Sequence, residues 1–419
     1  MSLNILKATL IIKLDVNNGK KMTGPTLKIA KRSKMPPFMA MDVMRLAAEL
    51  DAQGHDIVHL EVGQPSSSAP KPVMDALVDS MGQQKSHGYA VALGITELRQ
   101  RIAEHYQEWY QIDLDSERVA VTVGSSTGFA ISFMSAFDVG DRIAIPNPGY
   151  PAYRNLMLGM GLEPVILPAG AEEGWMPRLQ DMEKWDRLPD GLMIASPHNP
   201  TGVVIPDAEL KEICEWCDKN GVRLISDEIY HGLSYTGRCE TALKYTDNAI
   251  IINSLSKYFS MTGWRIGWMI LPEQLISAAE KLAQNLYISA PTPNQIASVK
   301  AFDCSDELDQ HVERYQENRQ VLLSGLPSEF LGNAAPCDGA FYIYADISAL
   351  SDDSIAFAKE LLDQTGVATT PGVDFDPING HRFLRLSFAG STATSMRLLN
   401  GLMDLLQPIN KTQPDKYPK

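Results

Sequence analysis

Basic residues are in the minority in this 419-residue chain, where 37 Lys and Arg stand against 51 Asp and Glu and the formal net charge is −14. Nucleic-acid binding needs clustered Lys and Arg, so this balance argues against nucleic acid as a partner. No apolar run reaches the length of a membrane span, and the start of the chain lacks the basic region and cleavage site of a signal peptide. These absences favour a cytoplasmic protein without membrane partners.

Cysteine is scarce as well, with five residues in the whole chain. A sparse, odd-numbered set in a long chain is typical of reduced thiols and not of a disulfide framework. Cys214 and Cys217 have the spacing of a redox or metal motif, but the stretch ELKEICEWCDKNG around them has the pattern of a helix. No second such pair or cluster of His accompanies them. We therefore interpret the pair as structural and expect no metal site.

The apolar pattern divides the chain into a large and a small domain. Residues 63–296 alternate short apolar runs with helical stretches, which predicts an α/β domain with a mainly parallel seven-stranded sheet flanked by helices. Residues 297–410 have an α+β pattern, and residues 35–62 are expected to join them. An N-terminal extension (1–34) and a tail (411–419) complete the division. The expected strands of the large domain are 119–123, 142–146, 163–167, 192–196, 222–226, 249–253 and 266–271; the expected elements of the small domain are helices 39–53, 307–324 and 392–406 and strands 57–61, 340–347, 366–370 and 382–388.

One segment carries the strongest chemical signal: Ser254-Leu255-Ser256-Lys257, followed by Gly263-Trp264-Arg265-Ile266-Gly267. A lysine just past the end of a strand can be desolvated, which lowers its pKa and frees the amine for imine formation. The hydroxyls and the arginine nearby suit a phosphate group. Taken alone, Lys257 would more often be a surface lysine, and the flanking residues are what favour the functional interpretation.

Three further motifs allow both a structural and a functional interpretation. Asp227, at the end of the apolar strand VRLIS, is either a turn former or a carboxylate for a pyridinium nitrogen, with Tyr230 offering its hydroxyl to the same ring. The loop Ser196–Gly202 is either a turn or a source of a donor, Asn199. The strand-turn-helix segment Thr122–Gly128 would suit phosphate at a helix N-terminus, but such turns are common.

These four motifs, in this order, resemble the fold-type I, pyridoxal-phosphate-dependent class I/II aminotransferases, over about residues 36–406. The resemblance implies that Lys257 holds pyridoxal 5'-phosphate as a Schiff base and moves a proton, that Asp227 pairs with the ring nitrogen, and that Tyr230 and Asn199 hold the phenolic oxygen. It also implies further binding residues: Ser125, Ser126, Ser254 and Arg265 for the phosphate, Tyr150 stacked on the ring, Arg385 for the substrate α-carboxylate, Gly63 in the loop over the substrate, and Tyr89 for the phosphate of a neighbouring subunit's cofactor. The last role implies a homodimer with shared active sites.

The activity implied by the resemblance is transamination from an L-amino acid to a 2-oxo acid, such as 2-oxoglutarate, in two ping-pong half-reactions of amino acid metabolism. Ser126 stands where members specific for acidic amino acids tend to have a lysine, which weakens an aspartate assignment. Phe341 and Tyr342 are either core residues or the lining of a pocket for an apolar or aromatic side chain. Gln64 and Ser66 also depart from the family pattern, and we assign these changes no meaning.

Two alternatives share this scaffold. A C–S β-lyase would use the same lysine, aspartate and arginine but release pyruvate and ammonia without an oxo-acid acceptor. A regulatory protein on an aminotransferase scaffold would carry a basic N-terminal helix-turn-helix domain, for which the 34 residues before Met35 are too few. The presence of Lys257 also argues against it.

Overall fold

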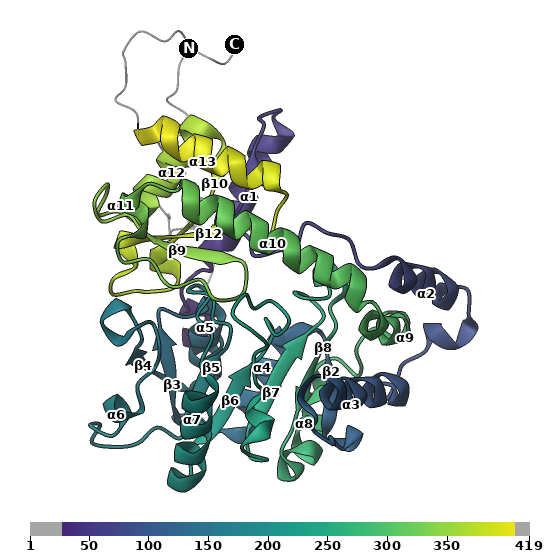
Figure 1. Cartoon of the computed structure of the whole chain (residues 1–419). Helices are drawn as coiled ribbons and strands as arrows, with labels where there is room; N and C mark the ends of the chain where they lie inside the picture. Colours follow the sequence, from purple (N-terminus) through teal and green to yellow (C-terminus); the bar gives the residue numbers. More distant parts are fainter. Residues whose placement is uncertain (1–26, 407–419) are drawn as a thin grey trace. The chain divides into compact units, whose positions relative to one another are not determined.

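The computed structural model describes residues 27–406, so most of the expected extension and the whole expected tail lie outside the described residues. The described residues before Met35 and those from Met35 onward form separate units. In the first, Lys31–Lys34 makes one turn of 3-10 helix. The remaining description concerns the second unit (Figure 1).

A seven-stranded sheet forms the centre of this unit, with strand order β2-β8-β7-β6-β5-β3-β4. The pairs from β7 through β6, β5 and β3 to β4 are parallel, whereas β8 is antiparallel to both β7 and β2. The expected mainly parallel seven-stranded sheet is therefore confirmed. The strands are β2 (Val119–Thr122), β3 (Arg142–Asn147), β4 (Glu163–Pro168), β5 (Gly191–Ala195), β6 (Arg223–Asp227), β7 (Ile250–Ser254) and β8 (Gly267–Ile270).

Both faces of the sheet are buried, which explains why its central strands are continuous apolar runs. In β7, the side chain of Ile251 packs in one core cluster while Ile250 and Ile252 pack in the other, as the alternation of a strand requires. Helices α4, α5 and α8 contribute to the second cluster, and α3 and α7 to the first. The helices of this region are α2 (Lys71–Met81), α3 (Thr96–Tyr110), α4 (Gly124–Ala136), α5 (Pro151–Met160), α6 (Leu179–Met182), α7 (Asp207–Asn220), α8 (Glu273–Leu286) and α9 (Thr292–Ser298).

Two smaller sheets are built from the ends of the chain. Strand β1 pairs in parallel with β10, and the order of the other sheet is β11-β12-β9. The predicted strand 366–370 is two short strands, because the chain leaves β1 and joins β12 after Thr369. The elements are α1 (Met39–Ala52), β1 (Val58–His59), α10 (Ser305–Gly325), α11 (Ser328–Leu331), β9 (Tyr342–Asp346), α12 (Ser354–Thr365), β10 (Val367–Ala368), β11 (Thr370–Pro371), β12 (Phe383–Ser387) and α13 (Thr392–Leu406).

The β1–β10 pair joins a segment that precedes the large sheet to one that follows it. Figure 1 shows β9, β12, α10, α12 and α13 gathered at one end of the large sheet. Between residues 27 and 406, no helix is long and apolar enough to cross a membrane.

Candidate active site

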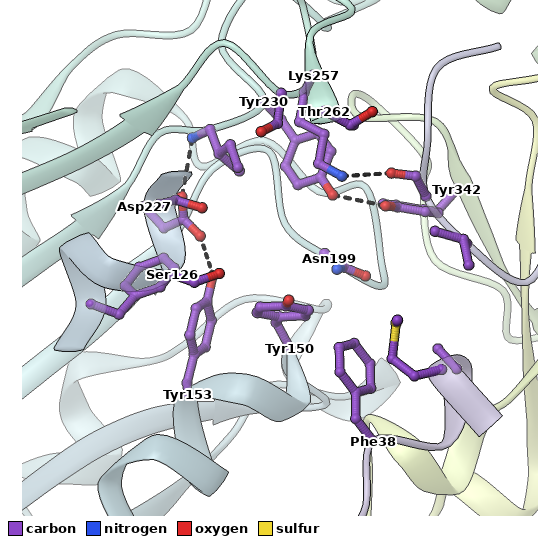
Figure 2. Close-up of a pocket in the computed structure, with 18 of the residues that line it drawn as sticks. Phe38, Ser126, Tyr150, Tyr153, Asn199, Asp227, Tyr230, Lys257, Thr262 and Tyr342 are labelled. Carbon is purple, nitrogen blue, oxygen red and sulfur yellow. Dashed lines mark hydrogen bonds between the residues drawn. The ribbon is translucent and has the colours of Figure 1, made fainter. Parts of the chain in front are cut away.

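A cavity of about 180 Å³ lies where β3, β5, β6 and β7 end (Figure 2). Ligands of parallel sheets bind at this edge because the loops that follow the strands meet there. Ten of the residues predicted from the sequence line the cavity: Gly63, Ser125, Ser126, Tyr150, Asn199, Asp227, Tyr230, Lys257, Arg265 and Arg385.

Lys257 follows β7 and points its amine into the cavity, where Nζ donates a hydrogen bond to the carbonyl oxygen of Gly63 at 2.5 Å. Burial of the amine lowers the pKa of Lys257 to about 7, and the nearby charge of Arg385 acts in the same direction. The amine is therefore available as a nucleophile or base near neutral pH.

Asp227 is the last residue of β6 and is buried. It lies across the cavity from Tyr342, which belongs to the β11-β12-β9 sheet (Figure 2). One carboxylate oxygen accepts a hydrogen bond from the backbone N–H of Ile229 at 3.1 Å, and the other accepts one from the hydroxyl of Tyr153. Burial raises the pKa of Asp227 to about 6, while these two donors oppose the rise. The two donors therefore favour the ionised carboxylate against the effect of burial.

Tyr230 and Tyr342 meet across the cavity, with their hydroxyl oxygens 2.8 Å apart (Figure 2). Tyr342 also explains why residue 63 is glycine: a Cβ at this position would lie 1.5 Å from the Tyr342 hydroxyl oxygen. The loop that contains Gly63, strand β9 and the turn after β6 therefore come together at the Tyr342 hydroxyl.

Arg385 is the buried cation of the small sheet, 2% exposed, on β12. Its Nη1 donates to Asn199 Oδ1 at 3.0 Å, and its Nη2 donates to the carbonyl oxygen of Glu61 at 2.6 Å and more distantly to Thr370 Oγ1 at 3.3 Å. Its guanidinium also lies over the ring of Tyr342, 4.4 Å from the centroid. The positive charge is held in place by neutral partners and remains available to an anion.

The start of α4 and Arg265 form a second part of the cavity that favours an anion, which we call the anion corner. Ser125 and Ser126 are in the first turn of α4, whose unpaired N–H groups favour an anion. The guanidinium of Arg265 lies so close to this turn that a Cβ on Gly124 would be 2.1 Å from Nη2. Gly124 itself has φ +69°, a conformation that glycine adopts readily.

Two predicted residues do not line the cavity. The Ser254 hydroxyl donates to the carbonyl oxygen of Ile266 at 2.9 Å and lies 2.8 Å from Ser256 Oγ, so Ser256 faces the cavity instead. Tyr89 is 82% exposed and lies away from this cavity, so its predicted role depends on a second subunit.

The sequence interpretation missed Tyr153, although it stands three residues after Tyr150 on α5 and so shares its face of the helix. It also missed Phe38, Ala40 and Met41, which reach the cavity from the start of α1. Spacing gave no signal for these, because α1 is separated from the other site residues in sequence.

The five cysteines are all buried and unpaired. Cys214 and Cys217 lie on α7, and burial raises the pKa of both thiols. The part of the chain that the structure describes contains no group of three His, Cys, Asp or Glu side chains arranged for a metal ion.

The residues of the cavity fit pyridoxal phosphate. A free amine (Lys257), a buried carboxylate (Asp227) and an anion corner (α4 and Arg265) suit the aldehyde, the ring nitrogen and the phosphate of that molecule, respectively. Arg385 is a further cation of the cavity and suits a carboxylate of the substrate.

Comparisons with known proteins show the family of the chain. The family Aminotransferase class I and II matches residues 55–402. The valine–pyruvate aminotransferase of Mycobacterium tuberculosis is 46% identical over 369 residues, which cover 87% of this chain and 95% of that protein. The crystal structure of an aminotransferase from M. tuberculosis has a TM-score of 0.88 at 44% identity and covers 91% of this chain and 99% of that one. Aspartate aminotransferase from Thermus thermophilus has a TM-score of 0.84 at 30% identity over 91% of this chain and all (100%) of that one.

Proposed function

The chain belongs to the class I and II aminotransferases, which use pyridoxal 5'-phosphate, and we propose that it transfers the amino group of an apolar L-amino acid to a monocarboxylic 2-oxo acid. The proposal rests on the number of basic side chains that line the cavity. The described residues that line it include three cations, Lys257, Arg265 and Arg385. One is needed for the cofactor aldehyde, one for the phosphate and one for the α-carboxylate, so none of the cations that this chain itself places at the cavity is left for a second substrate carboxylate.

The remaining walls support an apolar side chain. Phe38, Met41 and Val62 line the cavity on the side of α1 and β1, and Ser126 stands where a lysine would favour an acidic substrate. The valine–pyruvate enzyme of M. tuberculosis, with 46% identity, is named for an apolar donor and a monocarboxylic acceptor, which is the same substrate class.

When bound, pyridoxal phosphate would supply an electron sink and a carrier for the amino group, which would give ping-pong kinetics. Asp227 would keep a proton on the ring nitrogen, and Ser125, Ser126 and Arg265 would hold the phosphate. Tyr150 would form a wall beside the ring. Lys257 Nζ, with its pKa near 7, removes the proton from the substrate Cα.

Arg385 and Asn199 act together on the substrate and the cofactor. Arg385 binds the α-carboxylate with its forked guanidinium. Asn199 accepts a hydrogen bond from Arg385 through Oδ1, so its Nδ2 would be free to donate to the phenolic oxygen of the cofactor, as would the Tyr230 hydroxyl. The Gly63 carbonyl oxygen accepts from Lys257 Nζ, which places this loop beside the amine that would act on the substrate.

The direct test follows the visible absorbance of the yellow holoenzyme. We expect valine, leucine, methionine or phenylalanine to bleach it faster than aspartate, and pyruvate to restore it faster than 2-oxoglutarate. The Lys257→Ala variant should show neither change. Aspartate and 2-oxoglutarate as the best pair would overturn the substrate class, and release of pyruvate and ammonia from cystathionine without an oxo acid would indicate a β-lyase.

We also propose that the enzyme is a homodimer. Hydrogen bonds from Ala90 N to Ser289 Oγ (3.2 Å) and from Thr292 Oγ1 to the carbonyl oxygen of Gly88 (2.7 Å) join two segments of the chain. Exposed apolar side chains on these segments and on α2 form what we call the apolar patch: Met74, Val78 and Met81 of α2, Tyr89, Val91, Leu286 and Ile288. A second copy of the chain is the proposed cover, since exposed apolar patches mark protein interfaces. Tyr89, within the patch, would then reach the partner's cofactor phosphate.

A further inference from the structure

The start of helix α1 forms part of the cavity although it precedes the motifs that carry the other site residues. Phe38, Ala40 and Met41 line the cavity, and the ring of Phe38 meets that of Tyr150 edge-on with centroids 5.6 Å apart. Figure 2 shows Phe38 across the cavity from Lys257. This segment therefore faces the place where a substrate side chain would extend.

The segment does not hold itself in place. Phe38 occupies the N-cap position of α1 and its side chain has no group that can cap the helix. The first N–H groups of a helix need partners from elsewhere. Here the carboxylate of Asp374 supplies both: Met39 N donates to Oδ1 at 3.0 Å and Ala40 N donates to Oδ2 at 3.1 Å. Asp374 is only 3% exposed, so water does not compete for these bonds.

Asp374 also belongs to the unit that holds the substrate arginine. It ends the short turn Gly372–Asp374, which directly follows β11. In that strand, Thr370 is paired with Arg385 of β12, and Thr370 Oγ1 accepts a hydrogen bond from Arg385 Nη2 at 3.3 Å. One small sheet thus fixes both the cation for the α-carboxylate and the anchor of α1.

We propose that Asp374 is a positioning residue for substrate selectivity, which holds the start of α1 so that Phe38 and Met41 form an apolar wall against the substrate side chain. The inference rests on the proposed aminotransferase function, because the wall matters only when a substrate is bound to Arg385. Contact with such a wall favours each added methylene of a substrate by tenfold or more. Release of the helix start removes that contact but leaves Lys257, Asp227 and Arg385 in place.

The test compares four variants of the holoenzyme. Asp374→Ala removes the anchor, Phe38→Ala removes the wall, the double variant removes both, and Asp353→Ala is the matched control. Asp353 caps α12 through bonds from Ile355 N and Ala356 N, both 3.0 Å, but α12 does not contribute to the cavity lining. The rate of bleaching is measured with L-leucine and L-alanine, and cofactor affinity and thermal stability are measured on each variant.

We expect the leucine-to-alanine preference to fall about tenfold in Asp374→Ala and in Phe38→Ala. The double variant should fall no further, because the anchor acts through the wall. A fifth variant, Asp374→Asn, keeps one acceptor oxygen, so its preference should lie between those of the wild type and Asp374→Ala. Asp353→Ala should lose stability while keeping the wild-type preference, and cofactor affinity should change in none of the four.

Three results would overturn the proposal: an equal loss of rate with both amino acids in Asp374→Ala, the same change of preference in Asp353→Ala, or a double variant whose loss is the product of the two single losses. If Asp374→Ala does not fold, the intermediate preference of Asp374→Asn decides the question. A wild-type protein that is not bleached by any amino acid would instead refute the proposed function, which separates the two failures.

Discussion

At the scale of single residues, the chemistry of the cavity depends on how burial shifts two ionisable groups in opposite senses. Burial disfavours charge, so the pKa of Lys257 falls and that of Asp227 rises. The lysine thereby gains a free amine, whereas the aspartate needs donors to remain ionised. Both effects can be measured on the protein without substrate.

The low pKa of Lys257 predicts how cofactor loading depends on pH. An ordinary lysine is almost fully protonated until pH approaches 10.5, but Lys257 gains its free amine as pH rises through about 7. The rate at which the apoenzyme and pyridoxal phosphate develop visible absorbance should therefore rise between pH 6 and 8 and then level off. A rate that keeps rising to pH 10 would show that the amine is not desolvated.

Removal of the Tyr153 hydroxyl should lower the affinity for the cofactor. In Tyr153→Phe the carboxylate of Asp227 loses one donor, so its pKa should rise further above its usual range and the acid limit of cofactor binding should move to higher pH. Hydrogen bonds to charged groups contribute about 1.5 to 3 kcal/mol, which corresponds to at least about a tenfold loss of cofactor affinity.

The matched control for Tyr153→Phe is Tyr110→Phe. The Tyr110 hydroxyl lies 2.6 Å from His231 Nδ1, and Tyr110 does not line the cavity. Removal of this hydroxyl should therefore leave cofactor affinity unchanged. Titration of the apoenzyme with cofactor measures both variants. Equal losses in the two would mean that the effect comes from general destabilisation.

At the scale of elements, the turn from β2 into α4 shows how backbone approach builds an anion site. Gly124→Ala should both strain the backbone and displace Arg265, since the added Cβ would lie 2.1 Å from Nη2. Gly140→Ala is the control, because Gly140 also has positive φ (+96°) but nothing lies within 4 Å of an added Cβ. Each is expected to lose about 1 to 2 kcal/mol of unfolding free energy from the backbone alone.

Only Gly124→Ala should weaken cofactor binding, and inorganic phosphate should protect its apoenzyme against heat less well than it protects the wild type. Titration with cofactor and thermal unfolding with phosphate measure the two effects. Equal affinities in the two glycine variants would show that Arg265 does not depend on the close approach at Gly124.

At the scale of the whole molecule, the apolar patch around α2 predicts the oligomeric state. Sedimentation velocity should show a dimer for the wild type and monomers or weakened dimers for Val78→Glu, because a charge would be buried in the interface. Val139→Glu is the control, since Val139 is 83% exposed but outside the patch. If Tyr89 reaches the partner's phosphate, Val78→Glu should also weaken cofactor binding at low protein concentration. A wild-type monomer would contradict both expectations.

The sequence by itself determined the large sheet and most of the site. Apolar runs such as that of β7 identify strands buried on both faces, and residues that follow the ends of neighbouring parallel strands, such as Asp227 and Lys257, must meet at one edge. Local pattern and topology are enough for these conclusions, and the motif around Lys257 supplied the chemistry.

Only the tertiary structure decided which side chains face the cavity and what holds them. Ser256 replaces Ser254 at the wall because the Ser254 hydroxyl is occupied by the Ile266 carbonyl. Tyr153 belongs to the site because its hydroxyl donates to the Asp227 carboxylate. Asp374 contributes because its carboxylate accepts from the first N–H groups of α1, more than 300 residues earlier in the chain. Such contacts depend on packing between distant segments, and no periodicity along the chain records them.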